Sequence, residues 1–179
     1  MTGVQTCALP ISHGLDPQRV RVRRCGGDSR SESVLAGLAA LLSEGHDPQT
    51  WVLVHDAARP FVSQPTVDRV VTEVRAGRGA IPALPVVDTL KEVDADGRIT
   101  RTVDRARLWR AQTPQGFPRD MIAAAHARGL ADGVDATDDA ALCERLGHQV
   151  IVVPGSERAM KVTTEADFAR AESLWKAAE

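Results

Sequence analysis

Residues 51–85 read WVLVHDAARPFVSQPTVDRVVTEVRAGRGAIPALP, and they determine the fold class. The first four residues are continuously apolar, which predicts a buried strand. Ser63 then stands at the N-cap position of a helix that carries Pro65 in its first turn and valines at helical spacing. A second apolar run over residues 79–84 predicts another strand. Strand, helix and strand in this order indicate a βαβ unit, so the fold class is α/β with a mostly parallel sheet flanked by helices.

The alternation of strands and helices continues on both sides of this unit. Upstream, residues 20–22 predict a short strand, and Ser29 and Glu32 have the spacing of a capping box. Two downstream helices are expected to begin at capping residues, Thr137 and Thr164. The further expected elements are helices over residues 118–129 and 137–147, a strand over 149–153 and a helix that follows residue 164.

One segment breaks the alternation. Two charged strands, residues 90–93 and 99–103, flank a turn of sequence DADG, which predicts an antiparallel hairpin. The hairpin carries too little apolar surface to form part of a core. We therefore expect residues 86–107 to form an arm that packs against a second copy of the chain.

Composition excludes several classes of protein. A chain of 179 residues with 43% hydrophobic and 26% charged residues fits one globular domain. The net charge of -2 and the pI of about 6.2 argue against a nucleic-acid partner. No apolar run has the length that spans a bilayer, so no membrane association is expected. The three cysteines have neither disulfide nor metal-site spacing, which favours a reduced, cytoplasmic location.

The first residues stand apart from the rest. Residues 1–11, MTGVQTCALPI, resemble the translation of a sequencing-adapter oligonucleotide and carry no charged side chain. We expect them to be non-native, and residues 12–179 to form a single domain that is incomplete at its N-terminus. The alternative is a genuine N-terminal strand or signal fragment, although a signal peptide needs a basic region and a longer apolar stretch.

Candidate functional residues follow the strands, where open α/β sheets bind ligands. Asp56 is either a turn carboxylate or a magnesium ligand, since Mg²⁺ takes one or two carboxylates and keeps its waters. Arg59 is either a surface arginine or a donor to a nucleotide phosphate. Gly27 is a turn glycine, or lets the backbone approach a base or ribose. His55, taken alone, is typical of a core or turn histidine and not of a ligand.

Two further cations are candidates for binding a second anion. Arg105 lies at the base of the hairpin and, read alone, forms an exposed ion pair. Lys161 lies between Met160 and Val162 just before the last helix, where a lysine often extends along apolar surface to reach water.

Six stretches of the sequence together resemble one family. They are GGDSRSESVLAGL (26–38), VHDAARPFV (54–62), PVVDTLKEV (85–93), TVDRARLWRAQTPQGF (102–117), TDDA (137–140) and MKVTTEADFARAE (160–172). In this order and spacing, they resemble the 2-C-methyl-D-erythritol 4-phosphate cytidylyltransferases across nearly the whole chain after residue 19. The resemblance implies a Rossmann-like nucleotidyltransferase fold, CTP and Mg²⁺ as ligands, and a homodimer whose hairpin arms each reach the partner's site.

The resemblance also implies a role for each candidate residue. Those expected at the nucleotide are Gly27, Asp28 and Ser33 at the cytidine end, Asp56 as the magnesium ligand, and Arg59. Those expected at methylerythritol phosphate are Thr89 and Arg105 from the partner, with Thr113 and Lys161. Arg105 and Lys161 are the expected catalytic residues, because two anions must be brought together. The implied reaction is in-line attack of the acceptor phosphate on the α-phosphorus of CTP, which gives CDP-methylerythritol and pyrophosphate for isoprenoid precursor synthesis.

Departures from the family pattern leave alternatives open. The family's first strand and Gly-rich loop, with an Arg and a Lys around the triphosphate, are not found in this sequence, so we expect impaired activity. Ala159 stands where the family has asparagine. One alternative is a cytidylyltransferase for another polyol phosphate, such as ribitol 5-phosphate. The other is a non-catalytic nucleotide-binding or dimerisation module.

Overall fold

The computed structural model describes residues 24–43, 50–134 and 136–177. In chain order its elements are α1 (Arg30–Ser43), β1 (Trp51–Val54), α2 (Gln64–Arg75), β2 (Gly79–Pro85), β3 (Leu90–Val93), β4 (Ile99–Val103), β5 (Trp109–Ala111), β6 (Gln115–Pro118), α3 (Arg119–Ala131), α4 (Asp139–Arg145), β7 (Val150–Pro154) and α5 (Glu165–Lys176). The expected strand at 20–22 and the expected non-native segment at 1–11 lie outside the described residues. None of the described helices has the length and apolar character that crossing a bilayer requires.

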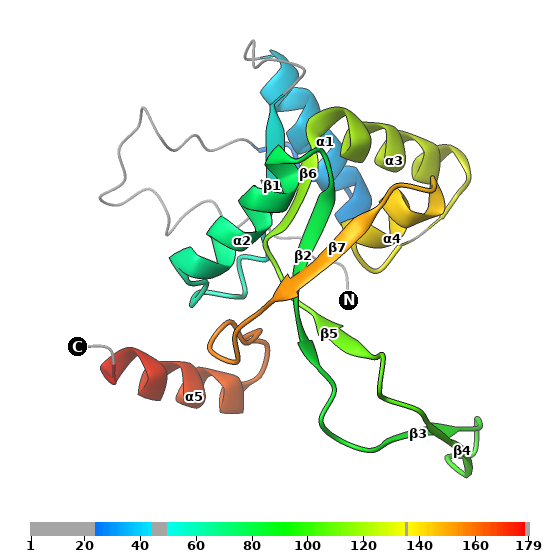
Figure 1. The fold of residues 1–179 in the computed structure, drawn as a ribbon, viewed down its shortest axis with the longest axis vertical. Helices are drawn as coiled ribbons and strands as arrows, with labels where there is room; N and C mark the ends of the chain where they lie inside the picture. Colours follow the sequence, from blue (N-terminus) through cyan, green and yellow to red (C-terminus); the bar gives the residue numbers. More distant parts are fainter. Residues whose placement is uncertain (1–23, 44–49, 135, 178–179) are drawn as a thin grey trace.

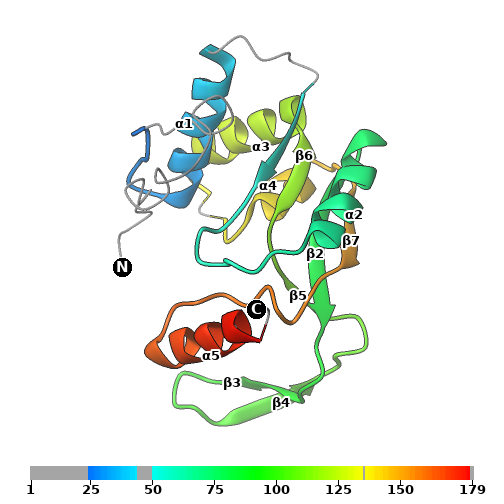
Figure 2. The same cartoon turned by 90° about the vertical axis from the view of Figure 1, so that its left-hand side faces the viewer.

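The main sheet lies between two layers of helix (Figure 1; Figure 2). Its strand order is β1-β6-β2-β5, and β7 pairs with β2. Helices α1, α3 and α4 pack on one face around Phe117 and Ile122, and α2 packs on the other face through Val70 and Val74. Alternate residues of each strand therefore face opposite layers, as the period of two in a strand requires.

The expected mostly parallel sheet is mixed in its pairing. Strands β1, β2 and β7 run in the same direction, as the βαβ pattern predicts. However, β6 pairs antiparallel with both β1 and β2 and lies between them, and β5 is antiparallel to β2. Among the described residues, the only parallel ladder joins β2 to β7. The sequence interpretation missed β5 and β6, which bring the chain back from the arm into the sheet.

Gly116 allows β6 to lie directly beneath α2. A Cβ atom at this position would lie 2.5 Å from Val70 Cγ1, 2.8 Å from Val74 Cγ2 and 2.9 Å from Leu53 Cδ2. Real Cβ atoms do not approach other atoms this closely, so α2 and β6 can pack at this distance only because residue 116 has no side chain.

The expected capping box of α1 and the expected Thr164 cap of α5 are confirmed. In α1, the Glu32 N–H donates to Ser29 Oγ and the Ser29 N–H donates to Glu32 Oε2, each at 3.1 Å. In α5, Thr164 and Asp167 make the same reciprocal pair of bonds. These bonds satisfy backbone donors that would otherwise lack partners in the first turn.

Two other expected caps differ in detail. Ser63 is the N-cap of α2, but its hydroxyl bonds the Thr66 hydroxyl at 2.9 Å instead of a backbone N–H. The N-cap of α4 is Asp138, not Thr137, because the Asp138 carboxylate accepts from the Ala141 N–H at 2.9 Å. Both residue types cap helices well, so the sequence alone does not decide between neighbouring positions.

Strand β1 is less buried than the continuous apolar run predicts. Trp51 is 37% exposed, and the other three residues are only partly buried. The Arg75 guanidinium lies 5.8 Å from the centre of the Trp51 ring, a cation–π contact that covers part of the indole.

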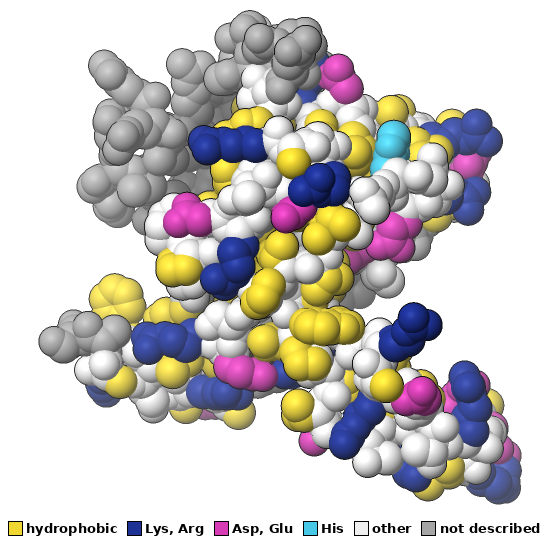
Figure 3. Space-filling model, in the orientation of Figure 1, with side chains coloured by type: hydrophobic (Ala, Val, Ile, Leu, Met, Phe, Trp, Pro, Cys, Tyr) yellow, Lys and Arg dark blue, Asp and Glu magenta, His cyan; other side chains and the backbone are white. Residues whose placement is uncertain are grey.

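Strands β3 and β4 form the expected hairpin, which projects from the body as an arm (Figure 2). Gly97 has a φ of +80° in the turn, where the Asp94 N–H donates to the Arg98 carbonyl at 2.9 Å. Every residue from 87 to 102 is exposed, including apolar side chains. Figure 3 shows the arm as a separate lobe. Its packing against a second copy stays a prediction.

Candidate functional site

The site forms where two loops meet at the carboxyl end of the sheet. The first loop, residues 55–60, follows β1, and the second, residues 155–163, joins β7 to α5. The Val162 N–H donates to the Ala58 carbonyl at 2.8 Å, and Arg59 Nη1 donates to the Ala159 carbonyl at 2.8 Å. These two bonds connect the loops directly, as expected for the strand ends of an α/β sheet.

The carboxylate of Asp56 lies between two cations. Its Oδ2 atom is 3.5 Å from Arg59 Nε and 3.4 Å from Lys161 Nζ. The side chains of Asp56 and Arg59 are 23% and 14% exposed, while that of Lys161 is 51% exposed. The structure brings these three candidate residues together, and their roles stay predictions. Two positive charges beside one negative charge leave a net positive site that attracts an anion.

Thr113 joins this site from the connection between β5 and β6. Its Oγ1 atom accepts from the Asp56 N–H at 3.0 Å and lies 2.8 Å from Nδ1 of His55. Thr113 itself is 5% exposed. In this structure it therefore holds the loop that carries Asp56, and contact with an acceptor stays a prediction.

Gln112 closes the second loop and was missed from sequence. Its Nε2 donates to the Ser156 carbonyl at 2.8 Å, and its Oε1 accepts from the Ser156 N–H at 3.0 Å. Gln112 is 6% exposed, and a Cβ atom on Gly155 would lie 2.3 Å from its Oε1. No local pattern marked Gln112, because its partner lies 44 positions away.

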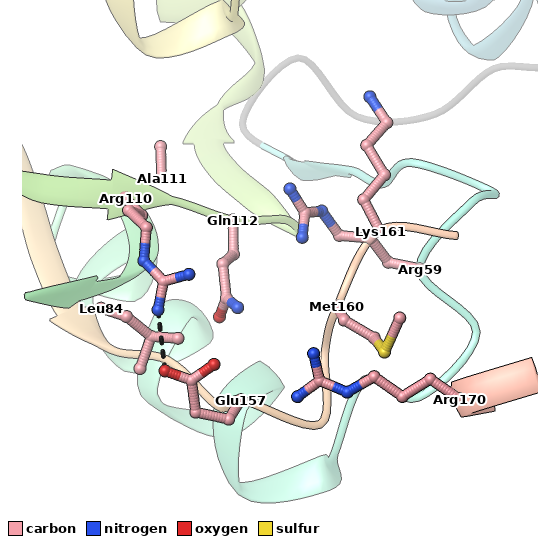
Figure 4. Close-up of a pocket in the computed structure, with 9 residues that line it drawn as sticks. All are labelled: Arg59, Leu84, Arg110, Ala111, Gln112, Glu157, Met160, Lys161 and Arg170. Carbon is pink, nitrogen blue, oxygen red and sulfur yellow. Dashed lines mark hydrogen bonds and ion pairs between the residues drawn. The ribbon is translucent and has the colours of Figure 1, made fainter. Parts of the chain in front are cut away.

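A cavity of about 230 Å³ lies beside these loops (Figure 4). Arg59 and Lys161 contribute to its wall, with Arg110 from β5 and Arg170 from α5. Arg110 forms an ion pair with Glu157 at 2.7 Å. The other lining residues are Leu84, Ala111, Gln112 and Met160. Four basic side chains against one acidic side chain extend the positive character of the site towards α5.

The expected cytidine-binding residues gather at the start of α1. The Gly27 N–H donates to Ser33 Oγ at 3.0 Å, and the Asp28 N–H donates to Glu32 Oε2 at 2.8 Å. A Cβ atom at position 27 would lie 2.4 Å from Glu32 Cβ, so this close approach requires glycine. Gly27, Asp28 and Ser33 thus lie together, and their contact with cytidine stays a prediction.

A buried polar cluster ties this loop to α4. Arg30 Nη1 and Nη2 donate to the two carboxylate oxygens of Asp139 at 2.9 and 2.5 Å, and His126 Nε2 donates to Oδ1 at 2.8 Å. Burial alone would raise the pKa of Asp139, but the bonds from His126 and Arg30 outweigh it and hold that pKa below its ordinary value. Gln115 Oε1 accepts from the N–H groups of Asp139 and Ala140, each at 3.1 Å. The sequence interpretation missed this cluster.

The two expected residues on the arm do not join the site within the chain. Thr89 and Arg105 are exposed at the base of the arm, and Arg105 Nη1 donates to the Val87 carbonyl. Their expected supply across a dimer stays a prediction.

The described residues hold no preformed cage for a metal ion. Among residues 24–43, 50–134 and 136–177, no three His, Cys, Asp or Glu side chains lie close enough together to ligate one. Asp56 offers a single carboxylate. That donor set fits Mg²⁺ in nucleotide sites, which takes one or two carboxylates with the substrate's phosphates.

Comparisons with known proteins agree on one family. The family model of 2-C-methyl-D-erythritol 4-phosphate cytidylyltransferase (IspD) matches residues 12–177. Curated enzymes of this name from Paraburkholderia xenovorans and Salinibacter ruber are 50% and 49% identical to the chain. These alignments cover 87% and 84% of the chain, which spans 68% and 61% of the lengths of those relatives.

Solved structures support the same family. The crystal structure of the cytidylyltransferase from Thermus thermophilus is 39% identical with a TM-score of 0.74, and the match covers 84% of this chain and 71% of that chain. A crystal structure of 4-diphosphocytidyl-2C-methyl-D-erythritol synthase is 37% identical with a TM-score of 0.79, over 88% of this chain and 71% of that chain. The expected Rossmann-like nucleotidyltransferase fold is therefore confirmed, and the chain belongs to the 2-C-methyl-D-erythritol 4-phosphate cytidylyltransferase family.

Proposed function

We propose that this chain transfers the cytidylyl group of CTP to 2-C-methyl-D-erythritol 4-phosphate and releases pyrophosphate. The observation that carries the proposal is the placement of the Asp56 carboxylate between Arg59 Nε and Lys161 Nζ, at 3.5 and 3.4 Å. The shared name of the relatives supports methylerythritol phosphate as the acceptor over ribitol 5-phosphate.

The reaction needs two anions to approach each other. An oxygen of the acceptor phosphate forms a bond to the α-phosphorus of CTP while the bond between that phosphorus and the bridging oxygen of pyrophosphate breaks. Lys161, which is half exposed, can orient the attacking phosphate, and Arg59 can neutralise charge on the nucleotide. Thr113 contributes by holding the backbone of Asp56.

Magnesium is the proposed metal, with Asp56 as its protein ligand. The single carboxylate leaves coordination positions for phosphate oxygens and waters. When bound, the ion would neutralise charge on the triphosphate. Asp56, whose Oδ2 lies 3.4 Å from Lys161 Nζ, would hold the ion, and Lys161 would bind the acceptor phosphate beside it.

The cytidine end of the nucleotide is proposed to lie at the start of α1. There, Asp28 is exposed and Gly27 leaves the backbone open to close approach. The N–H groups of Asp28 and Ser29 both donate to the Glu32 carboxylate, at 2.8 and 3.1 Å. A negative charge at this position disfavours a phosphate, which supports placing the uncharged base here instead.

We propose a homodimer in which Thr89 and Arg105 of each arm complete the partner's acceptor site. The arm exposes Val87, Val93 and Ile99, which are 67%, 52% and 64% exposed. Burial of such side chains favours association. Sedimentation velocity across a range of protein concentrations would test this, and a chain that stays monomeric at the enzyme's working concentration would contradict it.

A cytoplasmic location is proposed from the state of the cysteines. Cys25 and Cys143 are both free, and burial raises the pKa of the Cys143 thiol to about 12. A buried thiol of this kind is inert and suits a reducing compartment.

The deciding experiment measures pyrophosphate release from CTP with methylerythritol phosphate and, separately, with ribitol 5-phosphate. Lys161→Ala is expected to lower kcat by about 100-fold while changing the CTP Kd by less than about twofold, because Lys161 acts on the attacking phosphate. Lys176→Ala, which removes an exposed ion pair with Glu172 on α5, is the matched control and should match the parent. Equal losses in kcat and CTP affinity would contradict the role of Lys161.

The same assay separates the alternatives. Faster turnover with ribitol 5-phosphate would reassign the acceptor. CTP binding without pyrophosphate release from either acceptor would favour the nucleotide-binding module.

A further inference from the structure

His55 is a titratable residue at the centre of the site that the proposed reaction does not use. Its ring lies between two site residues: Nδ1 is 2.8 Å from Thr113 Oγ1, and Nε2 is 3.0 Å from the Arg59 carbonyl oxygen. The residue itself is exposed, so the ring has not been placed there by burial in a core. Its position is instead explained by the two hydrogen bonds.

The partners of the ring determine its tautomer. A backbone carbonyl can only accept, so Nε2 must carry the hydrogen that bonds the Arg59 oxygen. In the neutral ring, Nδ1 is then an acceptor, and the Thr113 hydroxyl donates its one hydrogen to it. The Thr113 oxygen keeps its lone pairs and accepts the Asp56 N–H at 3.0 Å. Every donor in this chain of three bonds therefore has a matching acceptor.

These bonds close a ring of contacts around the loop that carries Asp56 and Arg59. The Arg59 N–H donates to the Asp56 carbonyl at 2.9 Å, which completes the turn within the loop. Thr113 holds one end of the turn through the Asp56 N–H, and His55 holds the other end through the Arg59 carbonyl. Removing the imidazole would leave the Thr113 hydroxyl free to rotate and the Arg59 carbonyl without this partner.

We propose that His55 is a positioning residue that holds Asp56 and Arg59 in place for the nucleotide, as the Nε2–H tautomer bonded to Thr113. The link to the nucleotide rests on the function proposed above, whereas the bracing of the loop does not. His55 acts through Thr113 and the backbone, and no contact with the nucleotide is needed.

The first test reads the tautomer directly. Long-range ¹H–¹⁵N NMR spectra of the imidazole rings, with the His55 signals assigned by their loss in His55→Ala, are expected to show a protonated Nε2 and an unprotonated, hydrogen-bonded Nδ1. Thr113→Val, which keeps the shape of the side chain but removes the hydroxyl, should move the Nδ1 signal and leave Nε2–H in place. A protonated Nδ1 in the neutral ring of the parent would overturn the proposal.

The second test measures hydrogen exchange at the Asp56 amide. His55→Ala is expected to speed this exchange by about tenfold, the effect of losing about one hydrogen bond's stabilisation. His55→Asn keeps an oxygen acceptor near the place of Nδ1 and should stay within about twofold of the parent. His55→Gln keeps only a donor near the place of Nε2 and should resemble His55→Ala. His148→Ala, which changes a half-buried histidine between α4 and β7, is the control and should leave this amide unchanged.

A third measurement links the brace to the nucleotide. The Kd of CTP should rise about tenfold in His55→Ala and recover in His55→Asn, in parallel with the rate of exchange at Asp56. A parent chain that shows the expected tautomer and exchange but does not bind CTP would overturn the nucleotide assignment and leave the bracing intact. Unchanged Asp56 exchange in His55→Ala would overturn the bracing, whatever the CTP affinity.

Discussion

Replacing Asp139 with asparagine tests whether the buried cluster between α1 and α4 holds the fold together. The Asp139 side chain is fully buried and accepts two bonds from Arg30 and one from His126. Asparagine is nearly the same size but carries no charge, and its amide group places donors against the donors of Arg30. The variant therefore leaves the Arg30 cation partly buried and without its partner.

The expected loss of stability follows from the burial of the pair. Removing one partner of a buried ion pair costs about 3–5 kcal/mol. The Arg30 side chain is 27% exposed and can recover some hydration, which favours the lower end, about 3 kcal/mol. Equilibrium urea unfolding followed by circular dichroism would measure this at pH 7. Asp96→Asn is the control, because its ion pair with Arg98 at the hairpin tip is exposed and should contribute less than about 0.5 kcal/mol.

The pH dependence provides an independent check. Because the native pKa of Asp139 is held below its ordinary value of 3.8, its charge stabilises the fold above that value. The contribution is lost as the pH falls through the native pKa, so the difference between the parent and Asp139→Asn should shrink below about pH 3.8. A loss at pH 7 of less than about 1 kcal/mol, or a difference that grows towards low pH, would refute the reasoning.

Two further predictions concern packing and capping. In the same urea assay, Gly116→Ala should destabilise the chain by about 1–3 kcal/mol, because the new Cβ would lie within 3 Å of α2 side chains. Gly37→Ala in α1 is the control: its Cβ would have nothing within 4 Å, and the substitution should stabilise the chain by about 0.5–1 kcal/mol. Equal effects of the two substitutions would contradict the packing of α2 on β6. The pKa of Asp167 is lowered to about 2, chiefly by the hydrogen bond from the Thr163 N–H and then by the bonds with Thr164. The Asp167 part of the α5 cap should therefore persist in acid and be lost only as the pH falls through about 2. Carbon-detected NMR titration of the Asp167 carboxyl would check this, and a midpoint near 3.8 would contradict it.

Sequence periodicity was sufficient to predict the helices and the continuously apolar strands. Residues 51–54 and 79–84 are apolar runs, and the valines after Ser63 recur at helical spacing, so local pattern and final structure agree. The strands β5 and β6 have only three and four residues, and β6 contains a glycine and a proline. Their strand conformation is imposed by pairing with β1 and β2, which no local pattern reveals.

The candidate site, too, was predicted only in part from the sequence. Asp56, Arg59 and Lys161 stand in quoted motifs that follow strands, and the structure brings them together. The contacts that support these residues could not be predicted in this way, because each contact joins distant parts of the chain. Thr113 meets His55 across 58 positions, and Gln115 meets the Asp139 N–H across 24. Ordinary polar residues of this kind become recognisable only when the topology supplies their partners.

The place of β6 in the sheet also determines the order in which the sheet can be assembled. Strands β1 and β2 follow each other along the chain with only α2 between them, yet they do not pair, because β6 lies between them in the sheet. During synthesis, both strands therefore emerge before the strand that joins them, and residues 86–107 must also be made first. Until β6 inserts, the edges of β1 and β2 that it will cover have no partner in the sheet, and unpaired edges of this kind favour association with other chains. The joining of β1 to β2 is thus a central insertion and not the addition of an outer strand, which makes this part of folding dependent on distant contacts and correspondingly slow.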